Sequence, residues 1–230
     1  MMLQIDLWSE TFAEKLKEAF GTRLKFLGYQ GSYGRGEAAP QSDIDIVTVL
    51  DHVDTDDLDR YRLLVREMPH GELACGFLCG TRELYPRPKF DLYGLLLDTK
   101  SVWGNLLDWI PALTADSLRE ALQIGVSNLY HAACHTYLYH ENPKTALSAL
   151  GKQAFFCLRF CSLLKDGVYR AAKKDLFPCL DSREKALLSL SLEPERTAGF
   201  SDKETADAYT LLLQWCGDIL SKEEESSRGE

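Results

Sequence analysis

The first hundred residues alternate short apolar runs with segments in which apolar positions recur every three to four residues. The short runs, rich in β-branched and aromatic residues, predict strands. They lie at 24–29, 44–50, 73–78 and 90–97. Helical spacing predicts one helix from the capping residue Ser9 to Phe20, with Gly21 just past its end, and another over 56–67. This part of the chain is therefore predicted to fold around a small β-sheet.

The pattern changes near residue 101, where the content of glycine and β-branched residues falls and long helical periodicities begin. They predict helices at 103–110, 114–140, 144–165, 182–192 and 201–222. The order of elements predicts an α+β protein, with a small mixed-sheet domain over 1–100 and an all-α helical bundle over 101–223. Residues 224–230 are highly charged and are predicted to form a frayed tail.

Composition narrows the class of protein. A chain of 230 residues with 45% hydrophobic and 27% charged residues can bury a substantial core and has the make-up of a soluble globular protein. Its formal net charge of −9 disfavours DNA or RNA as a partner, because contacts to phosphates supply most of that affinity. No apolar run approaches ~20 residues, so we expect no membrane association.

The cysteines and the N-terminus indicate a compartment. Seven cysteines are an odd number and their spacing shows no disulfide framework, so they are interpreted as small buried residues in a reducing environment. The first residues lack the basic and apolar regions of a secretion signal. We therefore expect a cytoplasmic protein.

The stretch from Gly31 to Asp45 carries the strongest chemical signal in the chain. It joins a glycine-rich turn to two aspartates two positions apart, between two predicted strands. The turn at Gly31 and Ser32 and the glycine at Gly34 let the backbone approach an anion closely, with N–H groups and a hydroxyl as donors. Asp43 and Asp45 lie on one face of their strand, where two like charges repel unless a cation joins them. Mg²⁺ is commonly held by carboxylates together with substrate phosphates, so this pattern predicts a metal-nucleotide site.

These residues resemble the signature of a known superfamily. Gly31-Ser32, Arg35-Gly36, Ala38 and the run from Ser42 to Asp45 are similar to the motif of DNA-polymerase-β-like nucleotidyltransferases, in the form found in minimal and antibiotic-modifying enzymes. The resemblance implies that Asp43 and Asp45 bind Mg²⁺. It also implies that Gly31, Ser32 and Gly34 seat the phosphates of ATP or another nucleoside triphosphate. Arg35 either contacts a phosphate or braces the loop against an acidic neighbour.

A third carboxylate is expected from the same resemblance, because in that family it comes from a later strand beside the Asp-x-Asp strand. Asp91, near the start of the predicted strand 90–97, fits that position as a metal ligand or as the general base. Glu83 and Asp98 are alternatives for the base, since the proline-rich segment between 80 and 88 leaves the register open.

The lysine and arginine residues of the predicted bundle are weaker candidates for binding the nucleotide. Residues from 152 to 176 are similar to a helix-plus-loop pattern in the helical domains of such enzymes. Lys152 and Arg159 lie two turns apart on one helix face, where they either meet a triphosphate or are solvated. Lys173 and Lys174 are interpreted as surface residues, with an electrostatic role as the alternative.

Two other clusters are given structural interpretations. His131, Cys134 and His135 on one predicted helix lack the glutamate of a zincin motif and are interpreted as packing residues. The acidic segment 51–59 is interpreted as the start of a helix, capped by Asp54 or Thr55, rather than as a second metal site.

The sequence therefore predicts a Mg²⁺-dependent nucleotidyltransferase. It is expected to transfer a nucleoside monophosphate, with AMP as the expected group, from a nucleoside triphosphate to a hydroxyl group and to release pyrophosphate. The expected acceptor is a small molecule such as an aminoglycoside-like or lincosamide-like compound, since the acidic chain suits a cationic acceptor. One alternative is an antitoxin-type enzyme that adenylylates a partner protein. The other is a nucleotide-binding module without catalytic activity.

Overall fold

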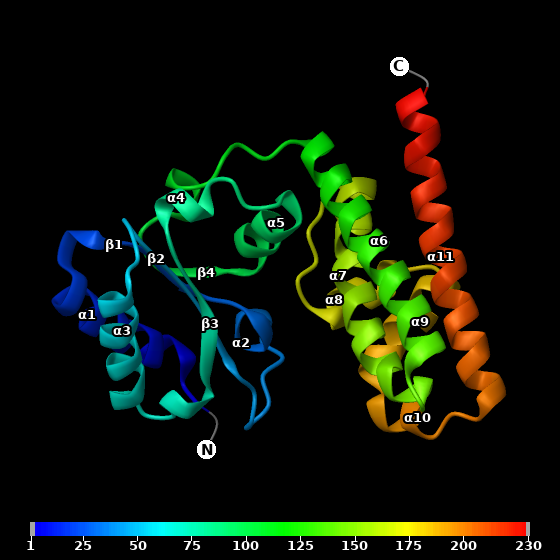
Figure 1. Ribbon diagram of the computed structural model, residues 1–230, viewed down its shortest axis with the longest axis horizontal. Coiled ribbons are helices and arrows are strands. Elements are labelled where there is room, and N and C mark those ends of the chain that lie inside the picture. Colours follow the sequence, from blue (N-terminus) through cyan, green and yellow to red (C-terminus); the bar gives the residue numbers. More distant parts are fainter. Residues whose placement is uncertain (1–2, 229–230) are drawn as a thin grey trace. The chain divides into compact units, whose positions relative to one another are not determined.

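The protein divides into two compact units, Met1–Leu113 and Thr114–Glu230. The computed structural model describes residues 3–228, with side chains for residues 3–221 (Figure 1). Strands occur in the first unit and a helical bundle makes up the second. The predicted α+β fold is thereby confirmed.

The first unit is built on a four-stranded mixed sheet in the order β3-β2-β1-β4. The strands are β1 (Leu24–Tyr29), β2 (Ile44–Leu50), β3 (Ala74–Gly80) and β4 (Lys100–Trp103). β1 pairs antiparallel with β2 and β4, whereas β2 and β3 run parallel. The two predicted strands that flank the glycine-rich motif form as expected, and they are neighbours at the centre of the sheet.

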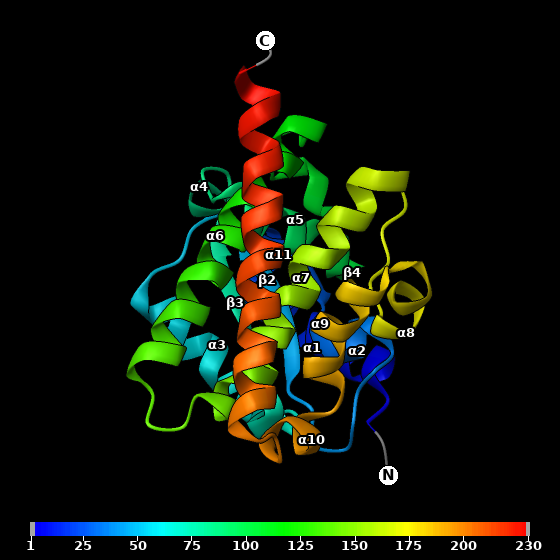
Figure 2. The ribbon, with the colours of Figure 1, turned by 90° about the vertical axis from the view of Figure 1, so that its right-hand side faces the viewer.

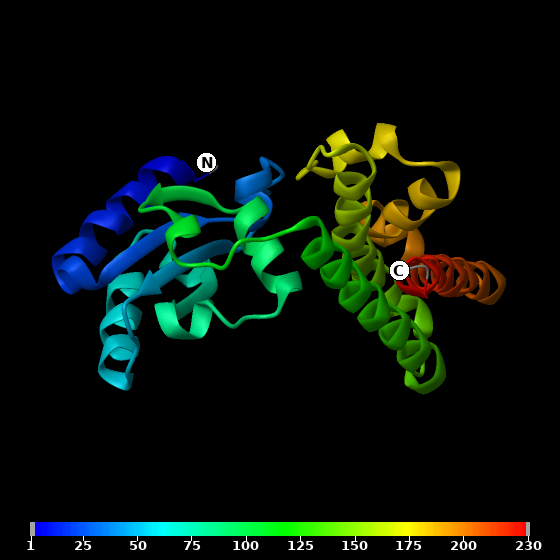
Figure 3. The same cartoon turned by 90° about the horizontal axis from the view of Figure 1, so that it is seen from above.

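Two hydrophobic cores hold this sheet, one on each face. Helices α1 (Ile5–Phe20) and α3 (Thr55–Glu67) cover one face, and α4 (Thr81–Leu84) and α5 (Lys89–Asp98) cover the other (Figures 1 and 3). Along β2, Ile44 and Ile46 belong to the first core, whereas Val47 and Val49 belong to the second. Because β2 is buried on both sides, its position is fixed tightly.

The first helix begins earlier than predicted. α1 starts at Ile5, and Ser9 is a buried residue inside it whose hydroxyl donates to the carbonyl of Asp6 at 3.0 Å. Asp54, by contrast, caps α3 as predicted, in a reciprocal capping box with Asp57.

Residues 90–97 form most of helix α5 instead of the predicted strand. Leu92 and Leu95 face the second core, and Pro88 precedes the helix at its N-cap. A short apolar run cannot be assigned to a strand or a buried helix from its periodicity alone, and burial on nearly all sides obscured the helical spacing here.

The segment 101–113 belongs to the first unit and not to the bundle. The predicted helix at 103–110 is replaced by strand β4, which adds to the edge of β1, and a short 3₁₀ turn, η3 (Leu106–Asp108). Leu106 and Ile110 pack into the core beneath α5. Pairing with β1, which is distant in sequence, determines that this segment begins with a strand rather than a helix.

The second unit is formed by four main helices, α6 (Ala115–Tyr139), α7 (Leu147–Asp166), α9 (Ser182–Leu192) and α11 (Asp202–Arg228) (Figure 2). Short helices α8 (Lys173–Leu176) and α10 (Pro194–Ala198) connect them. Thr114 caps α6, one of the two residues predicted for this role. α11 continues through 224–228, where a frayed tail was expected, and residues 229–230 of that tail lie outside the described residues.

The stretch Pro143–Asp166 is long and apolar enough to cross a membrane by length and composition, although no such stretch was expected. In the bundle, 56% of its apolar 18-residue window is buried, and α7 packs against α6 and α9. A core helix passes the same test of length and composition, and that is the role α7 has here.

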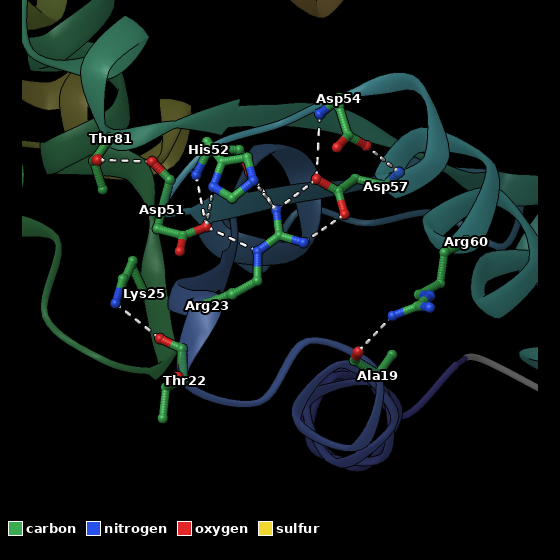
Figure 4. Close-up of polar contacts among 10 residues, drawn as sticks. All are labelled: Ala19, Thr22, Arg23, Lys25, Asp51, His52, Asp54, Asp57, Arg60 and Thr81. Carbon is green, nitrogen blue, oxygen red and sulfur yellow. Dashed lines mark hydrogen bonds and ion pairs between the residues drawn. The ribbon is translucent and has the colours of Figure 1, made fainter.

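An arginine joins the chain segments at the C-terminal end of β2. Arg23 donates two hydrogen bonds to the Asp57 carboxylate, at 2.8 and 2.6 Å, and one to Asp51 at 3.0 Å (Figure 4). Its guanidinium also donates to the carbonyl of His52 at 3.1 Å. These hydrogen bonds from Arg23 are the main reason that the pKa of Asp57 is lowered. Much of the acidic segment is therefore neutralised within the fold.

We predict that Arg23→Met lowers the free energy of unfolding by about 2 kcal/mol at neutral pH, because Asp57, with a side chain only 6% exposed, loses its charged partner. The native pKa of Asp57 is lowered, so this stabilisation is present above the ordinary aspartate pKa of about 3.9 and is lost as pH falls through the native value. The variant should therefore show a weaker loss of stability in acid.

Urea unfolding followed by tryptophan fluorescence measures this effect, since three of the four tryptophans lie in the first unit. The matched control is Arg62→Met, whose ion pair with Asp59 is exposed on both sides and should contribute at most about 0.5 kcal/mol. Equal losses in the two variants would contradict a structural role for Arg23.

Candidate active site

The carboxylate of Asp45 lies directly against the backbone of Gly31. A Cβ atom placed on Gly31 would be 1.7 Å from Asp45 Oδ2, and the φ of Gly31 is 68°. The amide of Gln30 also donates to the carbonyl of Asp45 at 2.8 Å. Glycine is thus required at position 31 for two reasons, its left-handed backbone and the space taken by the carboxylate.

The residues after Gly31 form one turn of helix, α2 (Gly31–Arg35), where the sequence predicted a turn. The amide of Gly34 donates to the carbonyl of Gln30 at 3.1 Å, and Glu37 donates to that of Ser32 at 2.8 Å. These bonds hold Ser32 at the start of the turn, next in sequence to the glycine that touches Asp45. The geometry brings the loop backbone beside a carboxylate, with the Ser32 hydroxyl on the next residue, as a phosphate and a metal ion together would need.

Asp43 and Asp45 lie at the start of β2, Asp43 exposed and Asp45 half-buried. Alternation along the strand puts Asp45 on the face of Val47 and Val49, opposite α1 and α3. Within residues 3–221, neither carboxylate forms an ion pair with a lysine, arginine or histidine. Two carboxylates without a counter-charge are a donor set that suits a divalent cation.

The neighbouring parallel strand places a cysteine beside Asp45. Cys75 of β3 is the direct register partner of Asp45, and its thiol donates to Asp45 Oδ1 at 3.6 Å. Burial and the nearby Asp45 carboxylate raise the pKa of Cys75. Sequence analysis missed this residue, because the parallel register of β2 and β3 joins positions thirty residues apart.

Asp91 does not lie on a strand next to β2, so the reasoning that assigned it as the third carboxylate does not hold. It lies in the first turn of α5 and forms an ion pair with Arg87 at 3.3 Å. The later strand beside β2 is β3, which contains no aspartate or glutamate. Arg87 in turn lies over the ring of Phe77, with its guanidinium carbon 4.3 Å from the ring centroid.

The two alternatives for the general base, Glu83 and Asp98, lie on different helices of the first unit. Glu83 is exposed on α4, beside Gly80 at the end of β3. Asp98 ends α5 and is 9% exposed. Its backbone carbonyl would be 3.0 Å from a Cβ on Gly34, so Asp98 adjoins the glycine-rich loop.

The structure contains one group of three metal-ligating side chains within the part of the chain it describes: His52, Asp54 and Asp57, with ligand atoms within 4.8 Å of one another. Arg23 already supplies a positive charge to Asp57 there. Asp43, Asp45 and Asp91 do not form such a group among the described residues. The acidic segment is therefore a charge-neutralised helix start, consistent with its interpretation from sequence.

Arg35 braces the loop. Its side chain is 10% exposed, and its Nε donates to the Glu37 carboxylate at 3.0 Å. This is the second of the two roles considered for it, with Glu37 as the acidic neighbour.

In the second unit, the predicted pair on α7 has two different environments. Lys152 is exposed, whereas Arg159 is fully buried, with its guanidinium carbon 4.7 Å from the ring centroids of Phe155 and Phe156. Tyr169, from the segment after α7, adds a third ring at 5.2 Å. Two residues on the same helix face differ in this way because the chain folds back over only one of them.

The remaining candidates in the second unit are two lysines and two histidines. Lys173 donates to the carbonyl of Ser191 at 3.3 Å, and Lys174 is exposed. His131 and His135, interpreted from sequence as packing residues, are exposed on α6. Their rings are 6.2 Å apart, and His135 lies 5.1 Å from Tyr139.

Comparison with known proteins agrees with this geometry. Residues 9–74 match the family model described as a nucleotidyltransferase domain. This region includes most of α1 and the whole of β1, α2, β2 and α3, and so it contains the complete glycine-rich motif and both aspartates. No curated protein matches the chain.

Two solved structures resemble the chain. A spectinomycin adenyltransferase from Enterococcus faecialis, determined with ATP and spectinomycin, has a TM-score of 0.55 and 14% identity, covering 93% of this chain and 99% of its own. At this identity the likeness shows a shared fold. A structure described as a toxin-antitoxin with AMP-PNP covers 55% of this chain and 90% of its own, at 20% identity and a TM-score of 0.32.

We predict that Gly31→Ala weakens Mn²⁺ binding to the full chain by at least about tenfold, because the added methyl group displaces the Asp45 carboxylate. Gly36→Ala is the matched control. Gly36 has nearly the same φ, 69°, but a Cβ there meets no atom within 4 Å. Titration with Mn²⁺ followed by electron paramagnetic resonance measures both, and equal weakening would show that backbone strain alone matters.

Proposed function

We propose that the chain carries a nucleotidyltransferase domain of the DNA-polymerase-β-like superfamily, and that it transfers AMP from ATP to a hydroxyl group with Mg²⁺ as the metal ion. The observation that carries the proposal is the contact of Asp45 with Gly31. It puts an acidic metal-binding group and a phosphate-binding turn at one place. A nucleoside triphosphate with its divalent ion needs both of these features.

The residues divide the work as follows. Asp43 and Asp45 hold the divalent ion, which when bound neutralises charge on the phosphates. The Ser32 hydroxyl and the loop backbone at Gly31 seat the β- and γ-phosphates, whereas the Gly34 amide is bonded to the Gln30 carbonyl and lets the chain turn closely there.

The reaction forms a bond between the acceptor oxygen and the α-phosphorus and breaks the bond from that phosphorus to the β-phosphate oxygen. Pyrophosphate leaves, and the proton of the acceptor hydroxyl passes to a carboxylate that acts as general base. Asp98 is the preferred base among the three carboxylates considered, because it adjoins the loop at Gly34. Asp91 is engaged with Arg87 instead.

A small molecule is the preferred acceptor. The fold shared with the spectinomycin adenyltransferase supports this choice, as does the net charge of −9, which attracts a cationic compound. A partner protein, modified by an antitoxin-type enzyme, is the second candidate. The seven free cysteines support a reducing compartment such as the cytoplasm.

We predict that the protein, given labelled ATP, Mg²⁺ and aminoglycoside-like or lincosamide-like compounds, transfers label to a small molecule. Asp45→Asn should reduce the rate by about 10³-fold with the fold intact, because a carboxylate that holds the ion is lost. Chromatography of the products measures transfer, and circular dichroism checks the fold.

The same reaction with cell lysate distinguishes the acceptors. Label on a protein band would support the protein-modifying alternative. Tight ATP binding without transfer to any acceptor would instead support a nucleotide-binding module without catalysis.

We predict that Asp91→Asn retains more than about one tenth of the activity, because Asp91 lies on a helix and is paired with Arg87. Loss of a general base costs about 10²–10⁴-fold. A fall of that size in kcat for Asp91→Asn would assign the base to it. Asp98→Asn and Glu83→Gln are measured alongside, and Asp98→Asn is expected to show the largest loss of the three.

A further inference from the structure

Cys75 is the side chain in contact with the Asp45 carboxylate in the part of the chain that the structure describes. It lies on β3, in direct register with Asp45 on the adjacent parallel strand. Directly paired residues on neighbouring strands point to the same face of a sheet. The thiol and the carboxylate therefore share one small region on the face opposite α1 and α3.

The distance between the thiol sulfur and the carboxylate oxygen is the distance expected between two ligands of one metal ion. Cys75 Sγ is 3.6 Å from Asp45 Oδ1. Metal bonds of about 2.3 Å to sulfur and about 2.1 Å to oxygen place two ligand atoms about 3.6 Å apart at a tetrahedral angle. A divalent ion bound to Asp45 Oδ1 thus has room to bind Sγ without a large movement of either strand. Among the described residues the Asp43 carboxylate does not lie within 4.8 Å of both atoms, so its side chain turns toward the ion on binding.

An ion also has a route to this position from solvent. Cys75 is exposed, because β3 is an edge strand of the sheet.

We propose that Cys75 is a ligand of the divalent ion held by Asp43 and Asp45, and that it sets the metal preference of the site. This rests on the proposed function, in which those two aspartates hold the ion. A sulfur ligand favours Zn²⁺, Co²⁺ and Cd²⁺, and it adds little for Mg²⁺, which prefers oxygen. The thiol proton passes to solvent as the ion binds. The site is then a mixed oxygen and sulfur site that softer ions occupy more tightly than Mg²⁺ does.

The test uses the full chain titrated with Co²⁺ and Cd²⁺, since a metal bonded to thiolate gives a charge-transfer absorption band that a carboxylate site lacks. We expect the band in the wild type and its loss in Cys75→Ser, with at least about tenfold weaker Co²⁺ binding by calorimetry. Mg²⁺ binding should change by less than about threefold. Cys75→Asp, which makes the site all-oxygen, should bind Mg²⁺ more tightly than the wild type.

Cys179→Ser is the matched control, because Cys179 is an exposed cysteine of the second unit. The band and the affinities should persist in this variant. Unchanged Co²⁺ binding and an unchanged band in Cys75→Ser would overturn the proposal and leave the thiol as a hydrogen-bond donor to Asp45.

The two proposals fail in different ways. If Cys75→Ser keeps its Co²⁺ affinity and its band while Asp45→Asn loses nucleotidyl transfer, the metal preference is wrong and the proposed function stands. If the wild type shows the Cys75-dependent band but transfers no nucleotide with any metal, the sulfur ligand stands and the proposed function is wrong.

Discussion

The contact between the Gly31 backbone and the Asp45 carboxylate is the constraint on which the site depends. It works only with a left-handed glycine at the end of the connection from β1, and with β2 held close enough for its first residues to touch that turn. β1 and β2 are paired neighbours, and the amide of Gln30 is bonded to the carbonyl of Asp45. The backbone of the sheet, more than any side-chain network, sets the distance between the loop and the acidic pair.

Two opposite electrostatic solutions occur at the two ends of β2. At its C-terminal end, Arg23 neutralises Asp51 and Asp57, and an acidic stretch becomes a capped helix start. At its N-terminal end, Asp43 and Asp45 form no ion pairs within residues 3–221. Like charges without a counter-ion are costly to keep together, so the contrast supports the proposal that a cation binds at the N-terminal end. Internal ion pairs make the other end a structural element.

In the second unit, helix starts follow from the local sequence, whereas the burial of a side chain depends on the segments that pack around it. Thr114 starts α6 and Asp181 starts α9 with side-chain caps, which are local features. Arg159 is different, because it is buried among rings contributed by α7 and by the segment that follows. Its helix position alone suggested the same exposure as Lys152.

The sequence by itself determined the central strands 24–29 and 44–50, the glycine-rich turn and the two aspartates, because these features are local and their spacing is rigid along the chain. It did not determine that 90–97 is a helix or that 100–103 is a strand, since a short apolar segment takes the form that its neighbours in space allow. Only the tertiary structure shows that Asp91 lies on a helix and that Cys75 lies beside Asp45. Pairing between distant strands chooses which residues meet, and a parallel pair such as β2 and β3 has no tight turn between its strands to set the register.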